Sequence, residues 1–237
     1  MTGPSVAVFG ANGSIGTAIC EWFRAKDHWI LGVGRKDRAD SPGFVGDSWL
    51  KWGGQENVDA FSAIEGSRFN AVVWAQGSNC SDNIIDLDLK THERMYAANV
   101  TYILLSLQCL LRKGLLAPSA RLCVISSIWQ NIARQNKLSY CITKSALQGL
   151  VQSLAVDLGP AGYLVNAVLP GALDTPMTRK NLSDEQLHRL EEATPLRTLP
   201  GMNDVCNLVG FLCSVENTGI TGQFIAADRG FSYARVV

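Results

Sequence analysis

Three side chains in the middle of the chain have the residue types and spacing that proton transfer needs. Tyr140 and Lys144 are four residues apart, so on a helix they lie on one face, about one turn from each other. Because a nearby cation stabilises a phenolate, by about 4 kcal/mol at ~4 Å and an effective dielectric of about 20, it can lower a tyrosine pKa of ~10 towards neutrality. Such a tyrosine can exchange a proton with a substrate oxygen. Ser127 lies thirteen residues upstream of Tyr140, at the end of an apolar run.

The Tyr-x-x-x-Lys spacing often occurs by chance as an exposed pair, so the elements around it must decide its meaning. Ser5–Phe9 is a short apolar run that predicts a buried parallel strand. The glycine-rich segment Gly10-Ala-Asn-Gly-Ser-Ile-Gly16 follows, and Ile19, Trp22 and Phe23 then recur at helical spacing. A strand, a glycine turn and a helix in this order predict a dinucleotide site, because backbone N–H groups at the helix start can bind a pyrophosphate. The alternative is an ordinary tight turn.

The second predicted strand, Trp29–Val33, indicates which dinucleotide is preferred. A site that prefers NAD usually has Asp or Glu at the strand tip, where it binds the ribose 2′-hydroxyl. Here the tip reads Gly-Arg-Lys, and Arg35 and Lys36 could pair with a 2′-phosphate. NADP(H) is therefore favoured over NAD(H). Arg35 could instead be a solvated loop residue, and Asp37 or Asp40 would restore NAD binding if the strand ended later.

Strand-like and helix-like segments alternate along the rest of the chain. This alternation predicts one α/β domain over residues 1–237, a doubly wound (Rossmann) parallel sheet with helices on both faces. The polar segment 172–200 is long for a connection and is predicted to be a mobile substrate lid. The predicted strands are Gly43–Asp47, Ala71–Trp74, Arg121–Ser127, Leu164–Leu169 and Gln223–Ala227, and the predicted helices are Val58–Ile64, Thr91–Leu111, Tyr140–Leu158, Asp184–Glu192 and Asp204–Cys213.

The composition excludes several classes of protein. The chain has 237 residues, of which 47% are hydrophobic, enough for one large core. The formal net charge is zero and no long run of Arg and Lys occurs, so nucleic-acid binding is not indicated. The seven cysteines have no metal-type spacing and suit reduced thiols, and no apolar run approaches the ~20 residues of a membrane span. We therefore expect a soluble cytoplasmic protein without a metal site.

With these elements in order, the chain resembles the short-chain dehydrogenase/reductase family, in its one-domain branch. The resemblance covers nearly the whole chain, from Gly10 to Gly230. It implies an NAD(P)(H)-dependent oxidoreductase that interconverts a carbonyl and a secondary alcohol by hydride transfer. The family marks present, in their usual order, are the glycine loop, Asn99, Ser127, Tyr140, Lys144, Asn166, Pro170-Gly171, Thr175, Ile220-Thr-Gly-Gln223 and Asp228-Arg-Gly230.

The resemblance implies a role for each matching residue. Tyr140 would protonate the carbonyl oxygen, and Ser127 would hydrogen-bond the same oxygen. Lys144 would hold the nicotinamide ribose and lower the tyrosine pKa, while Asn99 would support a proton path behind it. The positions implied to contact the cofactor are Gly10, Asn12, Gly13, Ser14, Ile15, Gly16, Arg35, Lys36, Asp47, Ala75, Gln76, Gly77, Asn99, Tyr140, Lys144, Pro170, Gly171, Leu173 and Thr175.

The implied substrate site is less defined. Ser127, Tyr140, Trp129 and Met177 are expected to contact a small-molecule carbonyl or alcohol, although Trp129 could equally be a packing residue. Relatives often assemble through the helices equivalent to those that carry Asn99 and Tyr140. The chain is therefore expected to form a homo-oligomer, a dimer or a tetramer.

Three departures from the family pattern place cofactor affinity in question. Ser14 stands where the second glycine of the loop is expected, Trp74-Ala75-Gln76-Gly77 replaces Asn-Asn-Ala-Gly, and Arg229 replaces a glycine near the end. One alternative is a dinucleotide-sensing regulatory protein without catalysis, against which the intact catalytic set argues. The glycine spacing also suggests a nucleotide-sugar epimerase, but such enzymes usually need a substantial further domain.

Overall fold

The protein is built on a twisted sheet of parallel strands. The computed structural model describes residues 3–54, 58–175, 178–179 and 183–233. The sheet has seven strands in the order β3-β2-β1-β4-β5-β6-β7, and all neighbouring strands pair in parallel. The strands are β1 (Ser5–Phe9), β2 (Trp29–Gly34), β3 (Ser48–Lys51), β4 (Phe69–Trp74), β5 (Leu116–Ile125), β6 (Leu164–Pro170) and β7 (Phe224–Ala227). The order reverses between β1 and β4, which is where open α/β sheets bind ligands.

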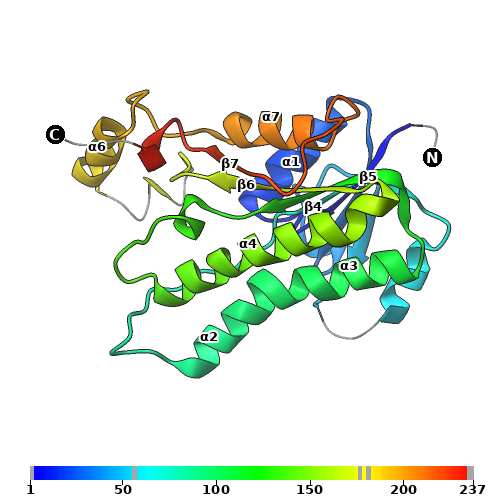
Figure 1. Cartoon of the computed structure of the whole chain (residues 1–237), viewed down its shortest axis with the longest axis horizontal. Coiled ribbons are helices and arrows are strands. Elements are labelled where there is room, and N and C mark those ends of the chain that lie inside the picture. Colours follow the sequence, from blue (N-terminus) through cyan, green and yellow to red (C-terminus); the bar gives the residue numbers. More distant parts are fainter. Residues whose placement is uncertain (1–2, 55–57, 176–177, 180–182, 234–237) are drawn as a thin grey trace.

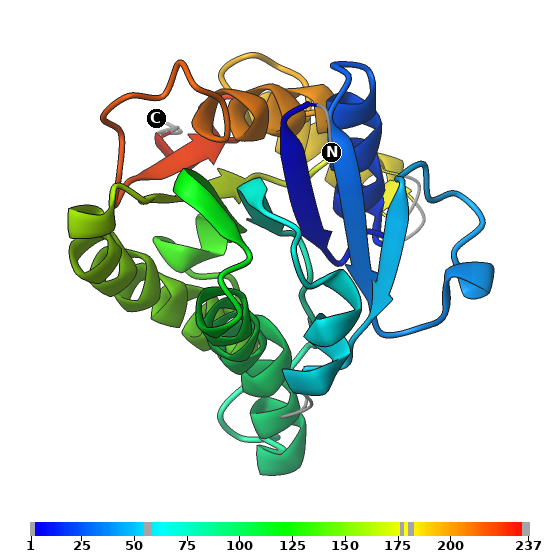
Figure 2. The ribbon, with the colours of Figure 1, turned by 90° about the vertical axis from the view of Figure 1, so that its right-hand side faces the viewer.

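Helices cover both faces of this sheet. Helices α1 and α7 lie on one face, and α3 and α4 lie on the other (Figure 1; Figure 2 shows the same layers after a turn of 90°). The helices are α1 (Ser14–Arg24), α2 (Leu89–Tyr96), α3 (Tyr102–Arg112), α4 (Leu138–Leu158), α6 (Asp184–Ala193) and α7 (Met202–Leu212). The predicted fold class is confirmed. None of these described helices is long and apolar enough to cross a membrane.

The strands are apolar along their length because both of their faces are buried. Successive side chains of a strand point to opposite faces. In β1, Ala7 and Phe9 pack into the core below α3 and α4, whereas Val6 and Val8 pack into the core below α1 and α7. The apolar residues of each helix then close one of these two cores.

The third strand lies at a different place from the one predicted. Residues 43–47 form an irregular segment, and β3 begins at Ser48. The Phe44 ring packs against Gly32 and Gly46, and a Cβ on either glycine would overlap it. The segment is therefore held by side-chain packing and not by strand pairing. Trp49 follows on β3 and covers Gly32 and Gly34 of β2. The alternation of apolar and polar residues in 43–47 was too short to distinguish a strand from a loop.

The long predicted helix is interrupted near its middle. The structure divides 91–111 into α2 and α3, which are joined by a π-helical stretch at Ala97–Thr101. Strand β5 also begins at Leu116, before the predicted Arg121, and ends at Ile125. Ser127 therefore lies in the connection after β5, where it begins the short helical turn Ile128–Gln130.

Candidate active site

The glycine loop closes tightly on the sheet. Gly10 has a positive φ of 77°, and a Cβ there would lie 2.6 Å from the backbone nitrogen of Gln76. A Cβ on Gly16 would lie 2.1 Å from the carbonyl oxygen of Gly10. Gly13 precedes α1 and provides no side chain to cap the helix. The N–H groups of its first turn, which begins with Ser14 and Ile15, therefore suit an anionic ligand.

A cavity of about 470 Å³ opens at the carboxyl ends of β1, β2 and β4. Seven of the predicted cofactor residues line it, which are Gly10, Asn12, Gly13, Arg35, Ala75, Gln76 and Gly77. No cofactor contact was predicted for the other lining residues, which are Gly34, Gly53, Gly54, Ser78, Arg94, Ala97, Ala98 and Tyr102. The Gly53-Gly54 pair could have indicated a further glycine loop at the cofactor site, but only once the end of β3 at Lys51 was known.

The residues of this cavity fit a dinucleotide. Gln76 has both side-chain amide atoms, Nε2 and Oε1, buried without a hydrogen-bond partner in the described structure. An unpaired buried amide costs free energy unless a ligand satisfies it. Together with the N–H groups of α1 and the Arg35 guanidinium at the same cavity, this amide suits the polar linker and ribose of a dinucleotide.

Asp47 does not belong to this cavity, and its assignment as a cofactor residue was wrong. Its carboxylate accepts a hydrogen bond from the backbone N–H of Ile30 at 2.7 Å and lies 2.8 Å from the Arg24 guanidinium. Ile30 is near the start of β2, about 13 Å along the strand from its carboxyl end at ~3.3 Å per residue. The predicted strand Gly43–Asp47 put Asp47 at the carboxyl end of the third strand. In the structure Asp47 instead comes directly before β3.

Asn99 holds the loop after β4 against α4. Its side chain is buried within the π-helical stretch, and its Oδ1 accepts a hydrogen bond from the Ser78 N–H at 2.6 Å. Its Nδ2 donates to the Ser78 carbonyl at 3.0 Å and to Thr143 Oγ1 at 2.9 Å. A Cβ on Gly77 would lie 3.3 Å from Asn99 Oδ1 and 3.8 Å from Lys144 Nζ. Asn99 and Lys144 therefore meet at the edge of the first cavity.

Lys144 is a buried cation. The side chain is 4% exposed, and its Nζ donates to the carbonyl oxygen of Ile125 at 3.0 Å. Burial lowers the pKa of Lys144 to about 8, because removal from water disfavours the charged form. The Nζ atom lies 5.7 Å from the centroid of the Tyr140 ring. The fold thus brings the predicted pair together.

Tyr140 and Ser127 also meet, but the tyrosine pKa moves against the expectation. Burial raises the pKa of Tyr140, while its hydrogen bond with Ser127 lowers it in part. The expected lowering of the Tyr140 pKa by Lys144 is absent: Lys144 Nζ donates its hydrogen bond to the Ile125 carbonyl and lies 5.7 Å from the ring centroid. In the protein alone, Tyr140 is therefore a protonated acid at neutral pH.

The remaining predicted positions lie around the ends of β6 and β2. Pro170 ends β6, the Gly171 N–H donates to the Ala227 carbonyl at 3.2 Å, and Leu173 is buried in the core below α7. Thr175 Oγ1 accepts a hydrogen bond from the Thr178 N–H at 3.1 Å. At β2, the Lys36 carbonyl accepts from the Trp49 indole at 3.0 Å. Met177 lies outside the described residues.

A second cavity, of about 740 Å³, lies beside Ser127. Trp129, for which a substrate contact was predicted, is one of its lining residues. The loop after β4 connects the two cavities, because Gly77 and Ser78 line the first and Asn79 and Ser81 line the second. The other lining residues are Ile128, Arg134, Lys137, Ala172, Thr178, Gln186, Arg189, Leu190, Ala193 and Phe231.

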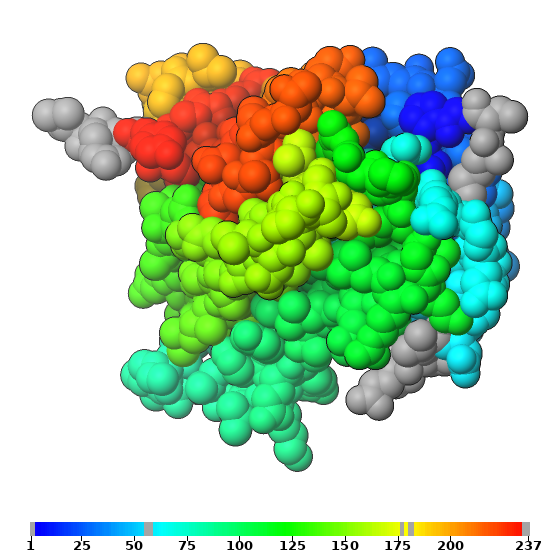
Figure 3. Space-filling model, turned by 45° about the vertical axis from the view of Figure 1, so that its right-hand side comes forward, coloured from blue at the N-terminus to red at the C-terminus, as the bar shows by residue number. Residues whose placement is uncertain are grey.

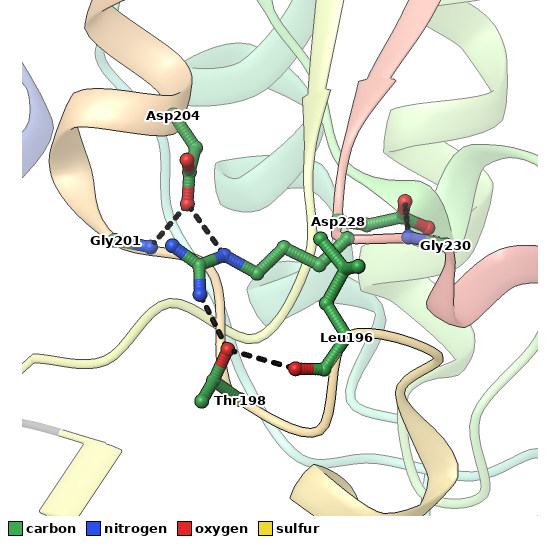
Figure 4. A network of polar contacts seen from close by, with 7 residues as sticks. Leu196, Thr198, Gly201, Asp204, Asp228 and Gly230 are labelled. Carbon is green, nitrogen blue, oxygen red and sulfur yellow. Dashed lines mark hydrogen bonds and ion pairs between the residues drawn. The ribbon is translucent and has the colours of Figure 1, made fainter.

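Arg229, which replaces a family glycine, links the end of β7 to the segment that precedes α7. Its φ of 54° is a conformation that favours glycine. Its Nε donates to Asp204 at 2.9 Å, and its guanidinium also donates to Thr198 Oγ1 (Figure 4). Asp204 in turn accepts from the Gly201 N–H at 2.8 Å. These contacts hold the Arg229 side chain between the end of β7 and the start of α7.

The sequence is similar to reductases over most of its length. A family model described as "Enoyl-(Acyl carrier protein) reductase" matches residues 56–232. The 3-oxoacyl-[acyl-carrier-protein] reductase FabG of Rickettsia felis is 26% identical over 235 residues, which cover 97% of each chain. FabG of Aquifex aeolicus is 35% identical over 144 residues, which cover 61% of this chain and only 58% of that relative.

The fold is also that of solved dehydrogenases. The structure of a gluconate 5-dehydrogenase from Burkholderia cenocepacia, in complex with NADP and tartrate, superposes with a TM-score of 0.87. The match covers 99% of this chain and 97% of that one, at 18% sequence identity. At this identity the likeness establishes the fold alone.

Proposed function

We propose that the chain is an NADP(H)-dependent enzyme that interconverts a carbonyl and a secondary alcohol, with Tyr140 as general acid and base. The premise is that it belongs to the short-chain dehydrogenase/reductase family and is an oxidoreductase. The observation that carries this proposal is the meeting of Ser127, Tyr140, Lys144 and Asn99. Gly77, which adjoins Asn99 and Lys144, lines the first cavity, and Ile128 and Trp129, which follow Ser127, line the second. None of the findings favours the regulatory, non-catalytic alternative.

The site residues suit carbonyl reduction. NADPH, when bound, supplies the hydride, and the carbonyl oxygen then develops negative charge. The Tyr140 hydroxyl donates its proton to this oxygen and the Ser127 hydroxyl donates a hydrogen bond, so both contacts strengthen in the transition state. The raised pKa of Tyr140 keeps that proton in place at neutral pH. Lys144, whose Nζ lies beside Gly77 of the first cavity, would hold the nicotinamide ribose when the dinucleotide is bound.

The surroundings of Arg35 support the preference for NADP(H). Arg35 is the first residue after β2 and lines the first cavity, and Gly34 before it offers no carboxylate. Asp37, which could have bound a ribose 2′-hydroxyl, is held by Lys51 at 2.7 Å. None of the described residues that line this cavity is acidic, and a charged guanidinium in such a place suits a 2′-phosphate.

Further expectations about the whole protein stay proposals. Helix α6 contributes four lining residues to the second cavity, so segment 172–200 is proposed as the substrate lid. Helices α3 and α4 lie side by side at the surface (Figure 3), and their exposed Leu104 and Ile142 would be covered in a homodimer or homotetramer. All seven cysteines are free, in accord with a reducing cytoplasm.

The proposal is tested by a panel of ketones assayed with NADPH and NADH in parallel, using the natural protein and Tyr140→Phe. We expect turnover with NADPH and a loss of about 10³-fold or more in Tyr140→Phe, because the phenol proton is gone while the ring stays. NADPH binding, measured by fluorescence titration, should be retained. Full activity of Tyr140→Phe, or NADPH binding without turnover of any ketone by the natural protein, would contradict the proposal.

A further inference from the structure

The second cavity has apolar walls close to the reacting hydroxyls. Ile128 and Trp129 directly follow Ser127, and Trp129 meets Phe231 edge to face with ring centroids 6.4 Å apart. Leu190 of α6 adds a further apolar wall. A cavity of about 740 Å³ with such walls has the size and lining of a small-molecule site. It suits a substrate with a hydrocarbon body.

The charges around these walls are of one sign. Arg134, Lys137 and Arg189 line the cavity, and none of its described lining residues is acidic. Arg189 is paired at 2.6 Å with Glu185 on the same helix, so its charge is largely compensated. The positive charge that this pair leaves at the cavity is that of Arg134 and Lys137.

Lys137 is anchored by neutral oxygens. Its Nζ donates to Asn79 Oδ1 at 3.1 Å, to the Cys80 carbonyl at 2.9 Å and to Ser81 Oγ at 3.2 Å. Asp82 also attracts Lys137, but its carboxylate is engaged by the Ser139 N–H at 3.1 Å. Lys137 therefore keeps its charge at the cavity wall, three residues before Tyr140 and about one helical turn from it.

Arg134 stands next to Lys137 and is exposed. Within the described residues it makes no ion pair or hydrogen bond, and its charge contributes, after burial, to lowering the pKa of Lys137. The two cations repel each other, and the attraction of Lys137 to Asp82 opposes this repulsion only in part, because burial and Arg134 still leave the pKa of Lys137 lowered. An anion that binds both relieves this repulsion.

From this cluster we infer that the substrate is an anionic carbonyl compound, in which a carboxylate or phosphate group beyond an apolar spacer binds Arg134 and Lys137. This inference rests on the proposed function, because it assigns the substrate class of the same site. The anion binds at the cations while the carbonyl reaches Ser127 and Tyr140. The apolar spacer lies along Ile128 and Trp129.

Matched charged and neutral ketones test the inference with NADPH as reductant. We expect kcat/KM for 4-oxopentanoate or 6-oxoheptanoate to exceed that for the corresponding methyl ester by at least tenfold. A ketone phosphate monoester of similar length distinguishes phosphate from carboxylate recognition. The preference should fall as KCl is raised, because exposed charges are screened. Equal kcat/KM values for the acids, the phosphate and the esters would overturn the inference.

Variants of Arg134 locate the recognition. Arg134→Gln should lower the acid-to-ester ratio of kcat/KM at least fivefold, mainly through the KM of the acid, and Arg134→Lys should restore most of it. Arg112→Gln, an exposed arginine at the end of α3, is the control and should leave the ratio unchanged. A ratio that is the same in Arg134→Gln as in the natural protein would also overturn the inference.

Equilibrium binding separates this inference from the proposed function. Calorimetric titration of the keto acids into the NADPH-bound protein requires no turnover. Binding of the acid that Arg134→Gln weakens supports the anion site even if no ketone is reduced, in which case the proposed function alone fails. Turnover of neutral ketones combined with no binding of any acid or phosphate would reject the anion site and leave the proposed function standing.

Discussion

Ser126 and Ser127 are adjacent hydroxyls to which the fold gives different partners. Ser126 Oγ donates to Gln130 Oε1 at 2.8 Å and is occupied within the protein. Ser127 lies close enough to Tyr140 to lower the pKa of its phenol in part, and its Oγ accepts a long bond of 3.3 Å from the Trp129 N–H. The spacing to Tyr140 favoured Ser127, and the observed partners give the physical reason for that preference.

Ser127→Ala should therefore lower kcat/KM for ketone reduction by roughly 10²–10³-fold, the usual cost of removing one donor to a developing oxyanion. Ser126→Ala is the matched control, because it removes the same atom one residue away, and should change kcat/KM less than about threefold. Steady-state kinetics with NADPH measures both. Equal losses in the two variants would mean that the effect is structural.

Arg35→Ala should weaken NADPH binding by ~1–3 kcal/mol, as expected for loss of a charge-assisted contact with the 2′-phosphate. NADH lacks that phosphate, so its affinity should change little. Lys36→Ala is the comparison variant, since Lys36 does not line the first cavity, and its effect on NADPH should be smaller. Fluorescence titration of both dinucleotides gives the four affinities. Equal weakening of NADPH and NADH would contradict the assignment.

Irregular geometry at the ends and joints of elements brings the site together. The π-helical stretch between α2 and α3 contains Asn99, whose amide reaches Ser78 and Thr143. Such stretches inside helices are frequent at functional sites. At the other end of the site, Arg229 connects β7 with Thr198 and with Asp204 at the start of α7. The π-helical stretch and the Arg229 contacts thus hold the loop after β4 and the segment before α7 in place.

Arg229→Gly tests the link that Arg229 makes to Thr198 and Asp204. Its loss of polar contacts is offset by relief of the positive φ, so the free energy of unfolding should change by less than ~1 kcal/mol. Proteolysis within segment 172–200 should become several-fold faster, because the link to Thr198 and Asp204 is cut. Arg197→Gly is the control: its φ of 56° is similar, but it bonds to the Glu192 carbonyl within the same segment. Unchanged proteolysis in Arg229→Gly would contradict the linking role.

At the scale of the molecule, the strand order places both cavities at one edge of the sheet. The loop after β4 lies at the reversal of strand order and lines the cofactor-shaped cavity and the second cavity in turn. The formal net charge is zero, yet cations gather at the second cavity. The proposed recognition of the substrate depends on where charges are placed and not on their sum. Lys144, at the edge of the first cavity, is a buried cation, and the cost of burying it falls on the stability of the whole fold.

The stability of the protein should show that cost as a pH dependence. Lys144 has a pKa of about 8 in the folded protein and 10.5 unfolded. Between these values the unfolded chain binds a proton that the folded chain has released, so the free energy of unfolding rises with pH, by about 3 kcal/mol at most. Below pH 8 both states are protonated and the folded state carries the full cost of the buried charge.

Lys144→Met removes this contribution and should be more stable than the natural protein at pH 7. Part of the gain is lost because the Ile125 carbonyl loses its donor. The difference should shrink as the pH rises towards 10, and urea unfolding of both proteins at pH 7 and 9.5 measures it. The comparison cancels the other titrating groups. A difference that does not change with pH would contradict a lowered lysine pKa.

The sequence by itself determined the fold class, the family and the local order of the site. Apolar strands, the glycine loop and the Tyr140–Lys144 spacing are short-range patterns, because side-chain periodicity and backbone freedom depend on neighbours in the chain. Six of the seven strands were therefore predicted within a few residues. The third strand was not, since residues 43–51 have no clear periodicity and their pairing depends on how Phe44 and Trp49 pack against β2.

Only the tertiary structure decided which groups face one another. It placed Asp47 at the wrong end of β2 for a cofactor, raised the pKa of Tyr140 by burial, and left the amide of Gln76 unpaired at the first cavity. It also set Arg134 beside Lys137 at a cavity without acidic lining in its described part. Burial and electrostatic interactions depend on segments far apart in the sequence, so residue types and spacing could indicate the reaction but not the charges around its substrate.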